Sequence, residues 1–139
     1  MTDENIRRNV ADGLALARSA LRAAAALCDL GIAPDAASRA YYAALHAARA
    51  LLFSIGLDAT SHRAVRSLVA RHFVQSGRLE AARSKDLAQL EALRTASDHD
   101  TTFALGVDDI RPEIDKARLF LDVVSALLVK DGLVEPPDA

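Results

Sequence analysis

An arginine and a histidine lie five positions apart in the segment Arg94–Asp100, which also contains Ser97 and Asp98. Arginine stays charged and can hold two phosphate oxygens at once, whereas histidine gains and loses a proton near neutral pH. Arg94 and His99 therefore have the chemistry that cleavage of a phosphodiester requires, and Asp98 can orient His99 or pair with Arg94. A surface ion-pair cluster without catalytic function is the alternative interpretation.

On a continuous α-helix, residues five positions apart project about 140° from each other. Arg94 and His99 then share a site only if the helix frays near Ser97, or if a second protein chain completes the site. The sequence leaves both geometries open.

A second group of polar side chains follows a helical spacing. Arg39, Tyr42, His46 and Arg49 recur at steps of three and four, which places them in one stripe along a helix. Apolar residues and alanines fill the rest of this helix, and small side chains allow a neighbouring helix to approach closely. The stripe suits contact with an anion, RNA or a nucleotide, and it equally suits a buried polar network that fixes helix packing or a dimer.

The composition favours one all-α domain. The chain has 139 residues, 51% of them hydrophobic, only 4% aromatic, with no Trp and a single Cys. These values exclude a disordered chain and a disulfide scaffold, and they argue against a base-stacking β-sheet. Cys28 is expected in the core, and no two of the four histidines lie four positions apart. No metal site and no cofactor are therefore predicted.

Charge is distributed unevenly along the chain. Residues 62–97 contain 7 basic and 3 acidic side chains, whereas residues 98–139 contain 4 basic and 10 acidic ones. The basic stretch can attract a phosphate backbone, although a solvated helix face is the simpler explanation. The polar N-terminus and the lack of a long apolar run predict a cytoplasmic protein without a membrane span.

Periodicity and capping residues predict four to five helices in an up-and-down bundle. The chain is predicted to be a single domain over residues 1–139, with an irregular stretch at 97–107 and a frayed tail at about 133–139. The expected helices cover residues 3–30, 34–55, 60–75, 80–96 and 108–130.

Three segments together resemble the HEPN superfamily of small α-helical domains, and more narrowly its UPF0332 branch. They are DAASRAYYAALHAARALLFSIGL (35–57), SHRAVRSLVARHFVQSG (61–77) and LRTASDHD (93–100), and the closing helix at 114–128 also fits. In that branch a tyrosine often stands where this chain has His99, and an alanine where it has Ser97.

The resemblance implies a function as well as a fold. Active HEPN proteins are metal-independent endoribonucleases with an R-x4–6-H motif, which Arg94 and His99 match. Their active site lies between two protomers, so the resemblance implies a homodimer. Many members are toxins encoded beside a nucleotidyltransferase antitoxin, which implies such a partner here. The alternative is a non-catalytic module that binds a nucleotide or that partner.

Overall fold

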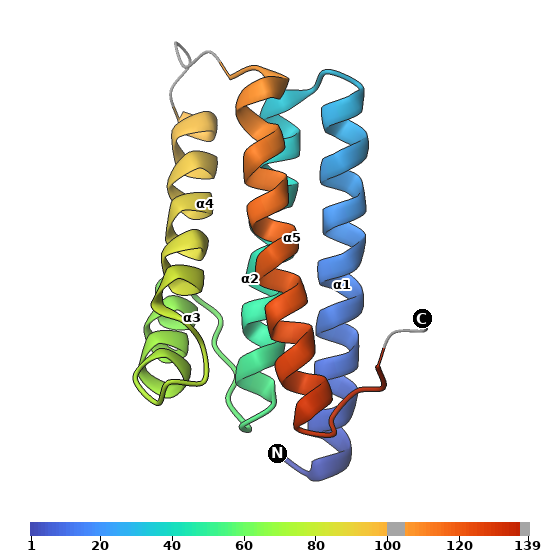
Figure 1. Cartoon of the computed structure of the whole chain (residues 1–139), viewed down its shortest axis with the longest axis vertical. Helices are drawn as coiled ribbons and strands as arrows, with labels where there is room; N and C mark the ends of the chain where they lie inside the picture. The colour runs from blue at the N-terminus through green and yellow to red at the C-terminus, as the bar shows by residue number, and fades with distance from the viewer. Residues whose placement is uncertain (100–104, 137–139) are drawn as a thin grey trace.

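The computed structural model describes residues 1–99 and 105–136, with side chains for 1–98 and 105–136. Its described part contains five α-helices and no strand, which confirms the predicted all-α bundle (Figure 1). The elements are α1 (Asp3–Asp29), α2 (Ala33–Phe53), α3 (His62–Val69), the π-helical segment η1 (Ala70–Val74), α4 (Ala81–His99) and α5 (Val107–Lys130).

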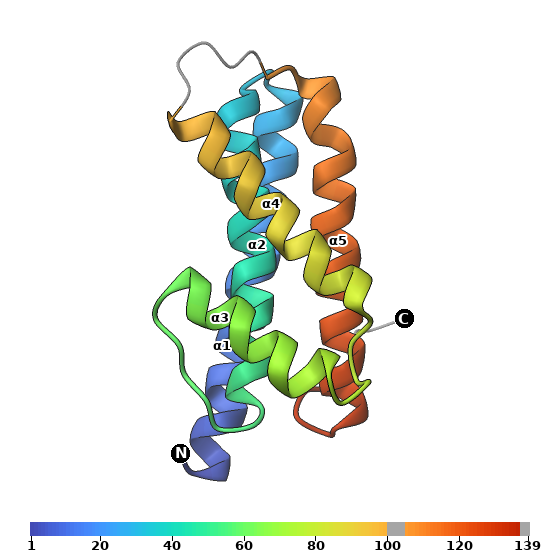
Figure 2. The ribbon, with the colours of Figure 1, turned by 90° about the vertical axis from the view of Figure 1, so that its left-hand side faces the viewer.

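Helix α2 is the centre of the bundle. It packs against α1, α3, α4 and α5, and 13 of its residues are buried. Most of these are alanines, whose small side chains bring the neighbouring helices close to the α2 backbone. Figure 2 shows α3 across the lower part of α2, while α4 runs diagonally past α2 and α5. The face formed by α3 and α4 is the one that carries the candidate site.

Helices α1 and α2 approach each other closely at Gly13. A Cβ atom added to Gly13 would lie 3.0 Å from the Ala50 Cβ atom and 3.6 Å from the carbonyl oxygen of His46. A larger residue would therefore push α1 away from α2.

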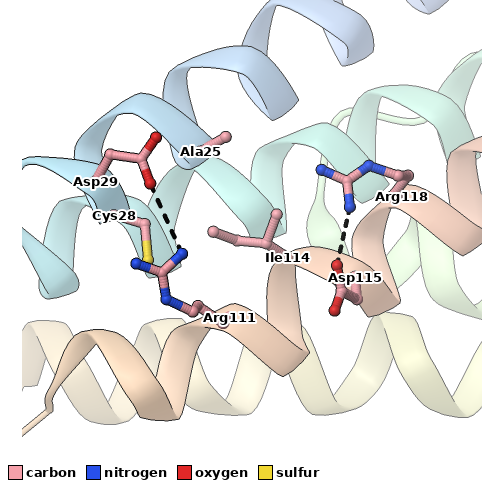
Figure 3. Close-up of a pocket in the computed structure, with 7 residues that line it drawn as sticks. All are labelled: Ala25, Cys28, Asp29, Arg111, Ile114, Asp115 and Arg118. Carbon is pink, nitrogen blue, oxygen red and sulfur yellow. Dashed lines mark hydrogen bonds and ion pairs between the residues drawn. The ribbon is translucent and has the colours of Figure 1, made fainter.

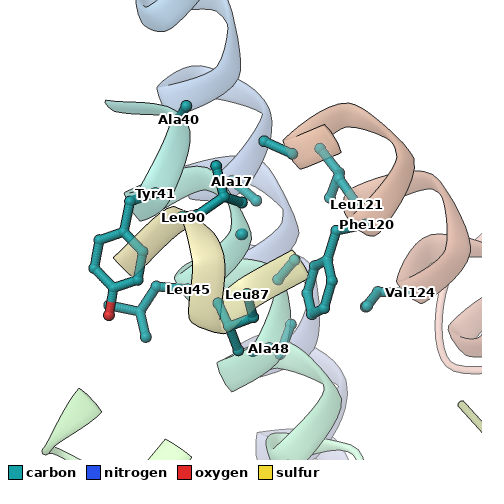
Figure 4. Close-up of a cluster of buried hydrophobic side chains, with 14 of the residues drawn as sticks. Ala17, Ala40, Tyr41, Leu45, Ala48, Leu87, Leu90, Phe120, Leu121 and Val124 are labelled. Atoms are coloured by element: carbon teal, nitrogen blue, oxygen red, sulfur yellow. The ribbon is translucent and has the colours of Figure 1, made fainter. Parts of the chain in front are cut away.

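Several of the larger core side chains come from α2, α4 and α5. Tyr41, Leu87, Leu90 and Phe120 are at most 1% exposed and meet around the alanines of α2 (Figure 4). Cys28 is 2% exposed, which confirms its predicted place in the core.

Local signals fix the helix ends close to their predicted positions. The Ser61 hydroxyl accepts a hydrogen bond from the Ala64 N–H at 3.0 Å, and this capping bond begins α3. The Gly106 N–H donates to the Asp109 carboxylate at 2.9 Å at the start of α5. Gly31 has a φ of 80°, a conformation that glycine adopts without steric cost, and it ends the turn after α1.

Two predictions about the helices were wrong. The helix expected over 60–75 becomes π-helical at Ala70, where the Gln75 N–H bonds to the Ala70 carbonyl oxygen at 3.0 Å. Helix α4 continues to His99, so residues 97–99 do not belong to an irregular stretch. Helix α5 begins at Val107, one residue before its expected start, and contains Pro112.

Part of the predicted frayed tail is packed. Leu133 and Val134 are half-buried against the core, and the Leu133 N–H bonds to the Leu128 carbonyl oxygen at 3.0 Å. Residues 137–139 lie outside the described part. Among the described residues, no helix is both long and apolar enough to cross a membrane.

Candidate functional site

Two arginines from different helices meet at one tyrosine ring. The Arg39 Cζ atom lies over the Tyr42 ring, 4.9 Å from its centroid, and the Arg94 Cζ atom lies 5.4 Å from the same centroid. Arg39 and Tyr42 come from α2, whereas Arg94 comes from α4. The structure therefore joins the two polar groups that the sequence left apart.

A histidine that the sequence analysis did not select completes this group. The His62 ring lies edge-on to Tyr41, with centroids 5.4 Å apart, and edge-on to Tyr42 at 6.2 Å. His62 is the first residue of α3, directly after the capping Ser61. The cap located the helix start, but only the packing of α3 against α2 brings His62 to the tyrosines.

We refer to these residues as the arginine–aromatic cluster. His46 also belongs to it, because its ring centroid lies 6.4 Å from that of Tyr42. The cluster consists of Arg39, Tyr41, Tyr42, His46, His62 and Arg94.

Tyr41 forms the buried floor of the cluster. Its side chain is fully buried, and its hydroxyl has no hydrogen-bond partner among the described residues. Burial, and to a smaller extent the Glu91 carboxylate, raises the pKa of Tyr41 above its usual value. The phenol therefore stays neutral under physiological conditions.

His46 is a neutral imidazole at neutral pH. Its pKa is lowered from the ordinary histidine value, first by burial and then by the positive charges of Arg49 and Arg39. A neutral imidazole has one N–H donor and one nitrogen acceptor, so His46 can form hydrogen bonds of both kinds.

The other predicted residues lie near the end of α4. The Arg94 Nε atom is 3.1 Å from an Asp98 carboxylate oxygen, so Asp98 pairs with the arginine. The Ser97 hydroxyl is buried without a hydrogen-bond partner in the described part of the chain. His99 is the last residue of α4, and its side chain lies outside the described residues, as does Asp100.

The helical conformation of α4 bears on the two ways in which Arg94 and His99 could share a site. Fraying near Ser97 was one way to bring Arg94 and His99 together, but α4 is helical through His99. Completion of the site by a second chain remains as a hypothesis.

The basic stretch is largely paired with carboxylates. Arg66 contacts Glu91 at 2.7 Å, Arg83 contacts Asp86 at 3.1 Å, and Arg78 pairs with Asp131. Within the described residues, the basic side chains of this stretch without such a pair are Arg63, Arg71 and Lys85.

A pocket between α1 and α5 lies apart from the cluster (Figure 3). It has a volume of about 220 Å³ and is lined by Cys28, Asp29, Arg111 and Arg118, among others. Its charges largely pair with each other: Arg111 is 3.7 Å from Asp29, and Arg118 is 2.8 Å from Asp115. None of the sequence-predicted site residues lines it.

Comparison with known proteins identifies the family. The HEPN domain family model matches residues 11–128, so this chain belongs to the HEPN domain family. The predicted resemblance is thereby confirmed.

Its relatives agree with the UPF0332 branch. A protein of Methanocaldococcus jannaschii named as a candidate toxin is 28% identical over 92% of this chain and 95% of its own length. A UPF0332 protein of Gloeobacter violaceus is 35% identical over 60% of this chain and 66% of its own length. A UPF0332 protein of Pyrococcus horikoshii is 42% identical over 48% of this chain and 47% of its own length.

Proposed function

We propose that this protein is a toxin-like, metal-independent endoribonuclease that acts as a homodimer. The observation that carries the proposal is the convergence of Arg39 and Arg94 on the Tyr42 ring, at 4.9 and 5.4 Å. An arginine that lies over an aromatic face can still direct N–H groups towards a phosphate. Two such cations on one ring form an anion-binding surface. Family membership and the relative named as a candidate toxin support an RNA substrate.

In the proposed reaction, the ribose 2′-oxygen attacks the adjacent phosphorus, and the bond from phosphorus to the 5′-oxygen breaks. The products are a 2′,3′-cyclic phosphate and a 5′-hydroxyl, and neither water nor a redox partner is consumed. His99 takes the proton from the 2′-hydroxyl or gives one to the leaving 5′-oxygen. Arg94 stabilises the negative charge that develops on the phosphate oxygens, and Asp98 positions Arg94 through their ion pair.

The remaining residues bind RNA in this proposal. Arg39 and Tyr42 hold the phosphate backbone beside Arg94, and His46 and Ser97 border the same surface. The unpaired Arg63, Arg71 and Lys85 add long-range attraction.

One observation favours a second candidate function. Asp98 neutralises part of the positive charge of Arg94, which a bound phosphate would need. A domain in which this pair stays closed would bind a nucleotide, or a nucleotidyltransferase partner, without cleaving RNA.

A single RNA-cleavage assay distinguishes the two candidate functions. We expect the purified protein to cleave RNA in the presence of EDTA, and His99→Ala to lower the rate by about 10²-fold or more. Both proteins should keep the same helical circular dichroism spectrum. Cleavage that His99→Ala leaves unchanged, or no cleavage by the folded wild-type protein, would contradict the nuclease proposal and favour the binding module.

A further inference from the structure

A second pocket, which His46 helps to line, lies between α1 and α2. It has a volume of about 210 Å³ and opens to solvent. Ligand pockets for larger molecules usually measure about 300–1,000 Å³, so this one suits a single planar group. Its lining residues are Asn9, Asp12, Gly13, Leu16, His46, Arg49 and Phe53.

Two apolar side chains line this α1–α2 pocket. Leu16 is 53% exposed, and Phe53 is half-buried, with the Arg49 guanidinium 5.6 Å from its ring centroid. Gly13 presses against Ala50, so no side chain from that position fills the space. The Leu16 side chain and the planar Arg49 guanidinium on Phe53 are surfaces against which a heterocyclic base can pack.

The polar groups on the rim are unpaired in part. The Asp12 carboxylate is exposed and has no ion pair or hydrogen bond within the described residues. Arg49 pairs with Asp58 through one terminal nitrogen at 3.0 Å, and its other terminal nitrogen forms no hydrogen bond within the described residues. The pocket thus presents a carboxylate with two acceptors and a guanidinium with an unused donor.

From this geometry we propose that the α1–α2 pocket binds a guanine base of the RNA substrate. A carboxylate needs two adjacent donors, and among the four bases only guanine offers them, at N1 and N2, on its Watson–Crick edge. Its O6 and N7 atoms are acceptors, which arginine recognises. Adenine and cytosine place an acceptor beside their donor, and uracil flanks its single N–H with two carbonyl groups.

The location links this pocket to the proposed cleavage site. His46 lines the pocket and also contacts the Tyr42 ring of the arginine–aromatic cluster. His46 lies seven positions after Arg39 on α2, which corresponds to roughly 10 Å along the helix. A short RNA strand can span that distance with its base in the pocket and a phosphate at the cluster. As a statement about RNA recognition, the inference rests on the proposed function.

The test is a binding measurement that does not require cleavage. Fluorescence anisotropy would compare two ten-nucleotide oligouridines, one with a central guanosine and one with a central adenosine. Both carry 2′-O-methyl groups, so they lack the 2′-hydroxyl nucleophile and are not cleaved. We expect the wild-type protein to bind the guanosine oligonucleotide about tenfold more tightly. Asp12→Asn replaces one acceptor with a donor and should reverse the preference towards adenosine. Asp122→Asn, which removes an exposed carboxylate on α5, is the matched control and should keep it.

Several results would overturn the guanine pocket. Equal binding of the two oligonucleotides by the wild-type protein would do so, as would an unchanged preference in Asp12→Asn or an equal loss in Asp122→Asn. Guanosine 5′-monophosphate that binds as tightly as the oligonucleotide would overturn the RNA assignment. This outcome can be told apart from that of the nuclease proposal. Guanine preference without cleavage would contradict only the nuclease proposal, and cleavage without guanine preference would contradict only the proposed guanine site.

Discussion

At the scale of single residues, Arg94 contacts both the aromatic rings of α2 and a carboxylate of its own helix. Its guanidinium lies within 5.9 Å of the Tyr41 centroid and 5.4 Å of the Tyr42 centroid, and it pairs with Asp98. Contact between a guanidinium and an aromatic face contributes about 0.5–1 kcal/mol at exposed sites. A lysine at this position would keep the charge but lose the planar group that contacts rings and carboxylate together.

Tyr41 allows a direct test of the cluster's buried floor. Removing a buried hydroxyl that has no protein partner lifts a desolvation penalty of about 1–3 kcal/mol. We therefore expect Tyr41→Phe to raise the free energy of unfolding by about 1 kcal/mol, measured by urea denaturation. The Tyr42 side chain is only half-buried, so Tyr42→Phe should change the free energy of unfolding less. A less stable Tyr41→Phe protein would show that the hydroxyl forms a bond that stabilises the fold.

His46 should make stability depend on pH. Its pKa is lowered in the folded protein by burial and by Arg49 and Arg39, whereas an unfolded chain has a histidine pKa of about 6.5. Below about pH 6.5 the unfolded state therefore binds more protons, and the free energy of unfolding falls as the pH falls towards the folded pKa.

Urea denaturation at a series of pH values from about 7.5 to 5 would measure this slope. We expect the slope to be shallower in His46→Gln than in the wild-type protein. An identical slope in His46→Gln would show that other groups cause the pH dependence.

At the scale of elements, the sequence predicted the number and order of the helices because their periodicity and caps are local signals. Ser61 and Gly31 fixed helix ends within a residue or two. The π-helical η1 was not predictable, since its apolar spacing resembles that of an α-helix. Nor was His62, whose place beside Tyr41 and Tyr42 depends on how α3 packs against α2.

The candidate site was predictable in part for the same reason. The stripe on α2 follows from helical spacing, but the contact of Arg94 with Tyr42 joins residues 52 positions apart in the sequence. No spacing rule for a single helix predicts such a contact. The tertiary packing of α4 against α2 creates it.

The contact between α1 and α2 should tolerate no large side chain at Gly13. We expect Gly13→Leu to lower the free energy of unfolding by about 1–3 kcal/mol, because even its Cβ atom would lie 3.0 Å from that of Ala50. Ala15→Leu, on the exposed side of α1, is the matched control and should be nearly neutral. Thermal unfolding of both variants would measure the difference, and equal melting temperatures would contradict tight packing at Gly13.

At the scale of the whole molecule, the proposed nuclease requires two chains. Arg94 and His99 lie on one continuous helix, where five positions correspond to about 140° of rotation. A site in which Arg94 of one protomer faces His99 of its partner removes this difficulty. The unpaired basic side chains of α3, η1 and α4 would then flank a shared RNA-binding surface.

Mixed dimers would test this arrangement. We expect Arg94→Ala and His99→Ala each to be inactive as homodimers, and a co-expressed mixture of the two to regain cleavage. In the mixed dimer, one of the two sites combines an intact Arg94 with an intact His99. Analytical ultracentrifugation of the wild-type protein would establish the dimer itself. An inactive mixed dimer would place both residues in a site within one chain.

The π-helical η1 has a consequence for how the chain can change length during evolution. Its hydrogen bond from Gln75 to Ala70 closes a turn that holds one residue more than an α-helical turn. Loss of one residue here would restore α-helical geometry, while the helices before and after could keep their faces towards the core. A deletion of a single residue is therefore accommodated more easily at 70–74 than within α2, where such a change would rotate the buried alanines away from their neighbours.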